Sequence, residues 1–390
     1  MLAVHGAVPS QQTRLPHKTG IIRRAKTHEY VEATTREGRH YGLGWWGQKM
    51  VSILKSCGTE LEIVCAVEPN PAAGDFCANN ELTPAARYDA ALARADVDAV
   101  ILATPHSLHP EQIDRGAAAR KHIFCEKPLA LTKADAERAV RLCRETGLVL
   151  GMGHERRFEP PIVDILQKAS GGHLGRILQI EANFSHDKFM TLNKSNWRLA
   201  PQEAPVAGMT ATGIHLTDLS VNLLGAAYDV RVSCETLASD FRQGDTFSAH
   251  VRFKGGGTAY VSATLVTPFV SRFAVFGTKG WIDVRDKAHV EAPAGWIITR
   301  ASVGSLIEIS EVGPAEPVRE NLVAFARAVR DCRPMRSRAK TSSITSHSWR
   351  QSHGQPQVGK LSQSADGPLD SVGLWLPYSV VQGISIPKKL

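Results

Sequence analysis

The sequence predicts an α/β domain with a parallel, doubly wound sheet, followed by an α+β domain with a mainly antiparallel sheet. The chain has 390 residues, more than one ordinary domain contains. From about residue 41 to 150, short β-branched runs alternate with Ala-, Arg- and Glu-rich stretches. From about residue 176, strand-like runs follow one another across short turns. Strands that alternate with helices are typical of parallel sheets, and strands that follow one another directly along the chain are typical of antiparallel sheets.

In the first domain, four apolar runs predict strands, at Leu61–Val67, Val97–Ala103, His122–Cys125 and Leu148–Met152. Four stretches between or after them predict helices, at Asn70–Asn80, Ala90–Ala95, Pro110–Arg120 and Thr132–Thr146. The last helix opens with a Thr-x-x-Asp capping pattern. One stretch fits badly: Glu37–Tyr41 is polar, although a buried central strand is expected before Gly42.

In the second domain, six runs predict strands, at Arg176–Asp187, Val230–Ala238, Ser248–Phe253, Thr258–Val266, Phe273–Phe276 and Trp281–Val284. A helix is expected at His215–Leu224, early in this domain. The predicted domains are therefore residues 41–150 and 151–332, between an atypical segment 1–40 and a tail 333–390 that we expect to be disordered.

The net charge of +8 lies in the two ends of the chain. Residues 1–40 carry seven basic and three acidic residues, and residues 333–390 carry eight and two. The central residues 41–332 carry 31 basic and 33 acidic residues and are almost neutral. The ends show no recognition surface with interleaved aromatic residues, so we expect no nucleic-acid partner. No apolar run approaches the ~18 residues of a membrane span, so we expect no membrane partner either.

The seven cysteines are scattered, and no pair has C-x-x-C spacing. This pattern argues against a disulfide framework and against a zinc site. It favours a reducing compartment, and the beginning of the chain lacks the pattern of a secretory signal. We therefore expect a cytoplasmic protein without a bound metal.

A G-x-G-x-x-G motif suggests dinucleotide binding. Its glycines would allow a tight turn and close approach of a pyrophosphate to the backbone at a helix N-terminus. Glu68 follows the strand Leu61–Val67, 21 residues after the last glycine, where a carboxylate would bind the ribose hydroxyls and repel a 2′-phosphate. NAD is thus expected over NADP, although a glycine-rich turn and a surface Glu would look alike. The motif comprises Gly42, Leu43, Gly44, Trp45, Trp46 and Gly47.

Glu126, Lys127 and Pro128 follow the strand His122–Cys125 at the ligand-binding edge of such a sheet. A lysine there can exchange a proton with a substrate hydroxyl if burial lowers its pKa. A solvated surface turn is the alternative. Pro128 would fix the direction of the backbone, and the sequence leaves open whether its peptide bond is cis.

Further polar residues could contact ligands. The small-residue stretch Gly208–Gly213 leads to His215, which would face a cleft or serve a structural role. Thr104–His109 ends a strand and could cover the nicotinamide, or its histidines could lie on the loop surface. Trp197, Arg198 and Arg156 could bind polar ligands, with ordinary salt bridges as the alternative.

Together these motifs resemble the Gfo/Idh/MocA oxidoreductase family, over roughly residues 42–332. The segments that carry the resemblance, in order, are GLGWWG, Glu68, ATPHSLH, CEKPLALT, GHERRFEP, NWR and GIHLTD. The resemblance implies a Rossmann domain, then an α+β domain whose open sheet commonly mediates homo-oligomers. It also implies NAD(P)-dependent oxidation of a secondary hydroxyl of a sugar, inositol or related polyol.

The resemblance also assigns roles to residues. It implies that Lys127 and His215 are the catalytic acid and base. The implied cofactor contacts are the Gly42–Gly47 loop, Glu68, Thr104, Pro105, His109, Glu126, Lys127, Trp197 and Arg198. The expected substrate contacts are Lys127, Arg156, Thr210, Thr212 and His215.

The chain departs from the family in three places. Many members have an Asp where this chain has Ala211, and Thr210 and Thr212 are possible substitutes. The stretch before Gly42 is polar. Neither end follows the family pattern, for which frameshifted translation at each end is a hypothesis. Two alternatives to a dehydrogenase stay open: an NAD-dependent glycoside hydrolase of related fold, which would give no net NADH, and a catalytically impaired dinucleotide-binding protein.

Overall fold

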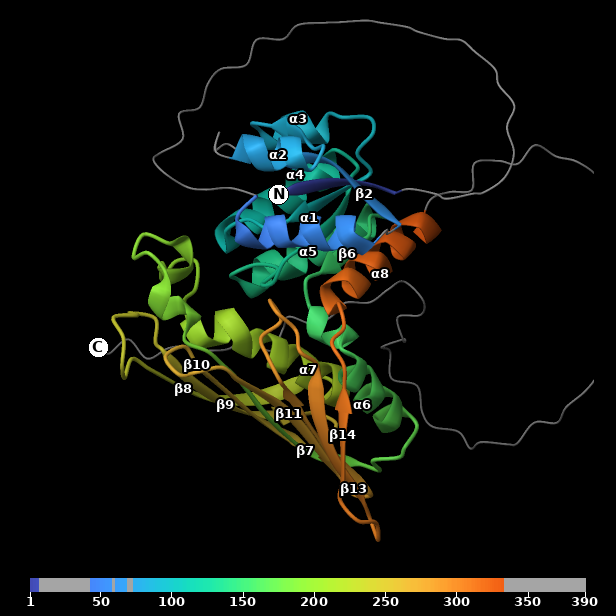
Figure 1. The fold of residues 1–390 in the computed structure, drawn as a ribbon, viewed down its shortest axis with the longest axis vertical. Coiled ribbons are helices and arrows are strands. Elements are labelled where there is room, and N and C mark those ends of the chain that lie inside the picture. Colours follow the sequence, from blue (N-terminus) through green and yellow to red (C-terminus); the bar gives the residue numbers. More distant parts are fainter. Residues whose placement is uncertain (7–42, 58–59, 69–72, 333–390) are drawn as a thin grey trace, which may run out of the picture.

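The computed structural model describes residues 1–6, 43–57, 60–68 and 73–332. These residues form a six-stranded sheet and an eight-stranded sheet, each with its own helices (Figure 1). The predicted tail 333–390 and the polar stretch before Gly42 lie outside the described residues. Within the described ranges, no helix is both long and apolar enough to cross a membrane.

The first sheet has the strand order β3-β2-β1-β4-β5-β6. Its strands are β1 (Leu2–Gly6), β2 (Leu61–Val67), β3 (Thr83–Ala85), β4 (Ala99–Leu102), β5 (His122–Cys125) and β6 (Leu150–Met152). Its helices are α1 (Trp45–Cys57), α2 (Gly74–Asn79), α3 (Tyr88–Leu92), α4 (His109–Ala118) and α5 (Lys133–Glu145). The pairs β2–β3, β4–β5 and β5–β6 are parallel, and the predicted α/β domain is confirmed.

Both faces of this sheet are buried. Along β4, Val100 and Leu102 pack with α3, α4 and α5, whereas Ala99 and Ile101 pack with α1, α2 and the C-terminal helix α8 (Pro317–Cys332). All four side chains are at most 3% exposed. This two-sided burial explains why the strand is a continuous apolar run.

The central strand differs from the expectation. Strand β1 lies between β2 and β4 and runs antiparallel to both. The sheet is therefore not wholly parallel. A strand between two buried neighbours requires apolar residues, and Leu2–Val4 is apolar whereas Glu37–Tyr41 is polar. Residues 2–6 therefore belong to this sheet, although they lie outside the predicted domain 41–150.

The second sheet has the order β14-β13-β12-β11-β7-β10-β9-β8, and its neighbours are antiparallel except β7 and β10. Its strands are β7 (Ile177–Ser185), β8 (Ala227–Glu235), β9 (Thr246–Phe253), β10 (Thr258–Thr264), β11 (Val270–Gly277), β12 (Gly280–Asp286), β13 (Trp296–Ser302) and β14 (Glu308–Val312). The predicted mainly antiparallel open sheet is confirmed. Sequence reasoning missed β3, β13 and β14.

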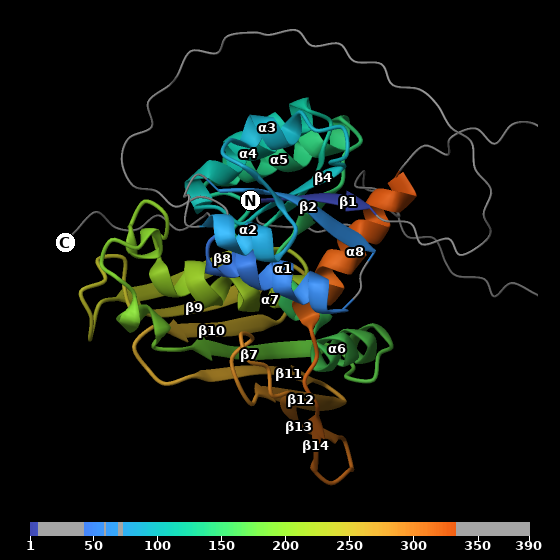
Figure 2. The ribbon, with the colours of Figure 1, turned by 45° about the horizontal axis from the view of Figure 1, so that its top comes forward.

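Two helices, α6 (Pro160–Ser170) and α7 (Ile214–Leu224), pack on one face of the second sheet. Residues of β9 alternate between buried and more exposed, which is the pattern of a sheet covered on one side. Figure 2 shows β9, β10, β7 and β11 side by side below the first domain. Among the described residues, the opposite face, here called the open face, exposes side chains such as Tyr260, which is 48% exposed.

Helix α8 returns from the second sheet to the first domain. Leu322 is fully buried there, and the Phe325 ring meets the Phe124 ring edge-on at a centroid distance of 5.6 Å. Gly151 of β6 leaves the room for this ring, because a Cβ at that position would lie 2.8 Å from Phe325. The helix thus completes one of the two cores of the first domain.

We expect Phe325→Ala to lower the free energy of unfolding by about 3–5 kcal/mol, because it empties a buried site under α8. Urea denaturation of the full chain measures this change. Leu306→Ala is the control, since Leu306 is 89% exposed and should lose little. A loss for Phe325→Ala no larger than that of the control would show that α8 does not stabilise the first domain.

Candidate active site

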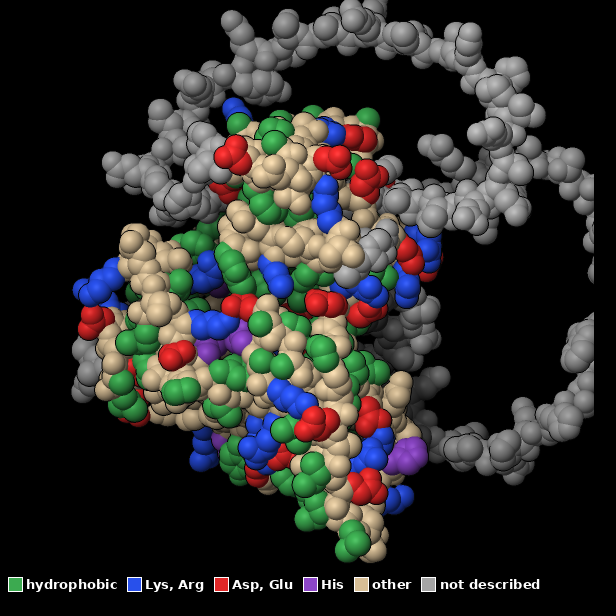
Figure 3. Space-filling view, in the orientation of Figure 1, with side chains coloured by type: hydrophobic (Ala, Val, Ile, Leu, Met, Phe, Trp, Pro, Cys, Tyr) green, Lys and Arg blue, Asp and Glu red, His purple; other side chains and the backbone are tan. Residues whose placement is uncertain are grey.

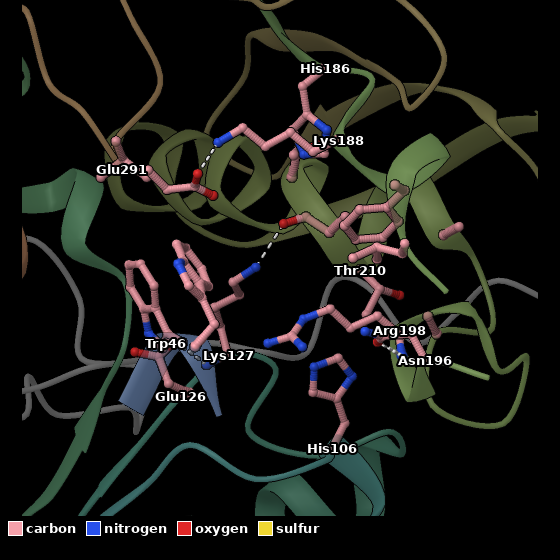
Figure 4. Close-up of a pocket in the computed structure, with 18 of the residues that line it drawn as sticks. Trp46, His106, Glu126, Lys127, His186, Lys188, Asn196, Arg198, Thr210 and Glu291 are labelled. Carbon is pink, nitrogen blue, oxygen red and sulfur yellow. Dashed lines mark hydrogen bonds and ion pairs between the residues drawn. The ribbon is translucent and has the colours of Figure 1, made fainter. Parts of the chain in front are cut away.

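A cavity of about 420 Å³ lies where β4 and β5 end and the second domain begins. Figure 3 shows histidine together with basic and acidic side chains at this junction. Figure 4 shows the lining side chains, which come from both domains and point toward one another. The carboxyl edge of a parallel sheet is where ligands bind in this architecture.

Lys127 extends into the cavity directly after β5. Its Nζ donates a hydrogen bond of 2.7 Å to the carbonyl of Ala211, which belongs to the second domain (Figure 4). The peptide bond between Lys127 and Pro128 is cis. Burial lowers the pKa of Lys127, and the carboxyls of Glu155 and Glu126 partly oppose that effect. A lysine with a lowered pKa can release and accept a proton near neutral pH.

His215 approaches Lys127 from the second domain. It lies in the first turn of α7, directly after a π-helical turn at Met209–Gly213. Its side chain is 4% exposed, and its Nδ1 has no hydrogen-bond partner among the described residues. Burial, and then the charge of Lys127, hold the pKa of His215 well below its usual value. The imidazole is therefore neutral, with one ring nitrogen that can donate a hydrogen bond and one that can accept one.

Two buried carboxyls stand beside Lys127. Glu126 is 8% exposed, and burial together with Glu155 raises its pKa to about 7. Gly153 allows Glu126 this position, because a Cβ at residue 153 would lie 2.5 Å from Glu126 Oε1. Glu155 is 6% exposed, and burial raises its pKa as well. The proton-exchanging groups of the cavity thus form one electrostatic cluster.

Aromatic and cationic side chains form another wall of the cavity. The guanidinium of Arg198 lies 4.3 Å from the centroid of the Trp197 ring, whose edge-on neighbour at 4.9 Å is His106. Asn196 caps this short helical turn through its side chain, which accepts from the Arg198 backbone N–H. The Trp197 ring offers a flat surface to a ligand, and the Arg198 guanidinium over it offers positive charge.

The features expected to hold a dinucleotide meet at the start of α1. The Leu43 backbone N–H donates a 2.9 Å hydrogen bond to the carboxylate of Glu68, which follows β2. No atom of the described residues lies within 4 Å of where a Cβ of Gly44 would stand. An open glycine at a helix N-terminus beside a carboxylate suits a pyrophosphate and a ribose. The residues present therefore fit a dinucleotide cofactor.

The structure brings most of the predicted site residues together. Those that line the cavity are Trp45, Trp46, Thr104, Glu126, Lys127, Trp197, Arg198, Thr210, Thr212 and His215. Leu43, Gly44, Gly47, Glu68 and Pro105 are not among the lining residues. Gly42 lies outside the described residues.

Two predicted residues serve the architecture. His109 is fully buried, and its ring nitrogens contact the carbonyls of Pro128 and Thr104 at 2.8 and 3.1 Å. Arg156 does not line the cavity, since its guanidinium contacts Ser271 at 2.8 Å and the carboxylates of Glu159 and Asp286. In this structure the side chains of His109 and Arg156 thus contact groups of the protein, and their expected ligand contacts stay predictions.

The structure also reveals lining residues that sequence reasoning had not selected. Glu155 follows β6 in the GHERRFEP segment. On the wall opposite Lys127, Lys188 forms an ion pair with Glu291 beside two imidazoles (Figure 4). Burial lowers the pKa of His186 to about 4 and that of His289 to about 3, so both are neutral. His186, Lys188, His289 and Glu291 stand outside the sequence motifs, so no local pattern pointed to them. No group of three or more potential metal ligands occurs in the described part of the chain.

Two family models match the chain. Residues 41–154 match the oxidoreductase family with an NAD-binding Rossmann fold, and residues 164–283 match the GFO/IDH/MocA C-terminal domain. The 1,5-anhydro-D-fructose reductase of Ensifer adhaerens is 30% identical over 60% of this chain and 70% of its own length. Matches to three further curated relatives cover only 40, 39 and 42% of those proteins.

Solved structures share the fold. A putative NADPH-dependent oxidoreductase from Desulfitobacterium hafniense has a TM-score of 0.68 at 24% identity, over 76% of this chain and 88% of that one. A levoglucosan dehydrogenase in complex with NADH and L-sorbose has a TM-score of 0.64 at 20% identity, over 74% of this chain and 88% of that one.

Proposed function

Since the chain belongs to the Gfo/Idh/MocA family and is an NAD(P)-dependent oxidoreductase, we propose that it oxidises a secondary hydroxyl of a sugar, inositol or related polyol. The observation that carries this proposal is that Lys127, after β5 of the first domain, and His215, in α7 of the second, line the same cavity. Both can exchange a proton with a hydroxyl group. The reverse reaction, reduction of a ketone, uses the same groups.

The proposed roles of the side chains follow from their positions. A bound nicotinamide supplies the hydride-transfer chemistry. Lys127, with His215 as its neighbour, accepts the hydroxyl proton in oxidation and returns it in reduction. Trp197 and Arg198 would hold the ligand by stacking and charge. The protein thereby contributes positioning and proton transfer.

The far wall of the cavity favours a neutral, hydroxyl-rich substrate. His186 and His289 are uncharged near pH 7, and the charge of Lys188 is balanced by Glu291. These groups offer hydrogen-bond donors and acceptors without a large net charge. The hydroxyl of Thr210 at the helix turn bonds the Val206 carbonyl and keeps acceptor capacity toward the cavity.

For the cofactor, we propose NAD over NADP. The support is Glu68, whose carboxylate stands beside the loop that leads into α1. A carboxylate at the ribose would accept hydrogen bonds from both hydroxyls of NAD, whereas it would repel the 2′-phosphate of NADP.

We expect Lys127→Ala to abolish NADH formation, by a factor of about 10² or more, because the proton acceptor is lost. NAD binding measured by calorimetry should change little. The control is Lys194→Ala, since the Lys194 side chain is 91% exposed. The assay is a screen of sugars and inositols with NAD and NADP, followed by absorbance of the reduced cofactor.

The same screen separates the two alternatives. A glycoside hydrolase would cleave a glycoside without net NADH, and an impaired binding protein would bind NAD while no polyol changes the absorbance. Full activity of Lys127→Ala would overturn the assignment of this residue.

We expect Glu68→Gln to reduce the preference for NAD over NADP by about tenfold, because the variant removes a like-charge repulsion. Gln keeps an oxygen for the Leu43 N–H, so the loop should be preserved. Binding of the two cofactors by calorimetry gives the ratio. Glu62→Gln at the other end of β2 is the control; an equal shift in both variants would contradict the proposed role.

We also propose that the open face of the second sheet forms a homo-oligomer interface. The support is a set of large apolar side chains on neighbouring strands, with Leu178 47%, Tyr260 48% and Val270 42% exposed. Light scattering should give a mass above that of one chain. Tyr260→Glu should lower this mass, whereas a single-chain mass for the unaltered protein would overturn the proposal. The expected cytoplasmic location stays a prediction.

A further inference from the structure

Glu155 is a buried carboxyl in the cavity to which the proposed reaction has so far given no role. It begins a single 3₁₀ turn, Glu155–Phe158, directly after β6. Its side chain lines the cavity together with Lys127 and His215, and it is 6% exposed. Burying a carboxylate costs free energy unless a group of opposite charge lies near it.

The neighbouring acids already have strong cationic partners. Asp218 holds Arg157 at 2.6 Å, and Glu159 holds Arg156 at 3.2 Å. The carboxylate of Glu155 instead lies 3.8 Å from Nε2 of His215, and this is its only ion-pair contact within the described ranges. Because that imidazole is neutral, Glu155 is left to interact with the charge of Lys127 across the cavity.

The helix that carries His215 supplies no acid beside Lys127. At residue 211 the chain has Ala, and Lys127 Nζ bonds its backbone carbonyl. A carbonyl dipole orients the amine, but it carries no charge to balance an ammonium. Building on the proposed function, we propose that Glu155 is the positioning residue that supplies the counter-charge of the Lys127–His215 pair.

The role follows from the balance of the reaction. In oxidation, the substrate O–H bond breaks and its proton passes to the neutral amine of Lys127, while the C–H bond breaks and its electron pair leaves with the hydrogen to the oxidised nicotinamide. The amine becomes a buried ammonium. The carboxylate of Glu155 stabilises this new charge, while His215 stays neutral and can hydrogen-bond the substrate oxygen.

Glu126 is the other carboxyl that could supply the counter-charge to Lys127, and the structure favours Glu155 for this role. Burial raises the pKa of both carboxyls, that of Glu126 to about 7. One of its oxygens also lies 3.3 Å from the backbone N–H of Lys127. Of the two carboxyls, Glu155 has the larger effect on the pKa of Lys127, which it raises.

Other charged groups face this cluster and must stay constant in the test. Arg198 acts on Lys127 from the stacked wall, and Arg156 and Asp218 act on Glu155. His154 lies edge-on to His215 at 5.9 Å, and His186 and His289 face the cavity from the second sheet. The variants below leave these residues unchanged.

The test measures the proton affinity of Lys127 without using activity. In the full-length, cofactor-free protein, competitive labelling with acetic anhydride across pH, read by mass spectrometry at Lys127, gives the midpoint at which the amine becomes reactive. We expect Glu155→Gln to move this midpoint down by about one pH unit, since an anion stabilises the ammonium. Glu291→Gln removes a carboxylate from the far wall of the same cavity and should leave the midpoint in place.

Kinetics and a rescue variant complete the test. With Glu155→Gln, the pH profile of kcat should move down with the labelling midpoint, and kcat at its plateau should fall about tenfold while KM changes little. Glu155→Asp, or Glu155→Gln combined with Ala211→Asp, should restore the midpoint. If Glu155→Gln does not fold, Ala211→Asp alone is measured instead. An upward shift of the labelling midpoint in that variant is expected if a carboxylate in this cavity raises the pKa of Lys127.

An unchanged midpoint in Glu155→Gln, or an equal shift in Glu291→Gln, would overturn the role of Glu155. The proposed function would survive that result if polyol oxidation persists. Conversely, a shifted midpoint without any polyol oxidation would retain the electrostatic role and reject the proposed function.

Discussion

The burial of one lysine amine is the constraint on which the site depends. Lys127 is half-buried at the cavity, and this burial lowers its pKa. The groups around the amine act on its position and its pKa. The Ala211 carbonyl accepts its hydrogen bond, the buried carboxyls of Glu155 and Glu126 raise its pKa, and His215 stays neutral. An exposed lysine would be a permanent cation and a poor proton acceptor.

The two domains are both needed to bury this amine. Strand β5 carries Lys127 to the edge of the first sheet, and the π-helical turn before α7 brings the second domain against it. Helix α8 then returns to the first domain, where Phe325 packs on Phe124 of the same β5. The strand that presents the lysine is thus held in place by the end of the second domain.

Sequence patterns predicted the parts of the fold that depend on local runs. β2 and β5 were predicted with their observed bounds because each is an apolar run between polar turns. The central strand could not be predicted in this way, because the partnership of Leu2–Gly6 with β2 and β4 is a long-range pairing. Strand β14 was missed because it is an edge strand of the second sheet and is largely exposed, without an apolar run. Strand β13 was missed because its apolar run is only three residues long, Trp296–Ile298.

The residues of the site also divide into those whose place a local pattern predicted and those whose place depends on the folded chain. Lys127 and His215 stand in motifs that follow predicted elements, so their position at the sheet edge could be expected. Arg156 stands in a motif as well, yet its guanidinium binds Glu159, three residues further on, and Asp286, which comes near only once the chain has folded. Burial and pairing decide which polar residue is available to a ligand, and neither is visible in a local pattern.

The placement of negative charge around Lys127 illustrates the same physics. What matters to a buried ammonium is the distance to a carboxylate and the exclusion of water between them, not the chain segment that supplies it. Ala211 supplies no charge to Lys127, and Glu155 brings a carboxyl into the cavity from the turn after β6. A site can therefore keep its electrostatic balance while the residue that provides it moves from one element to another.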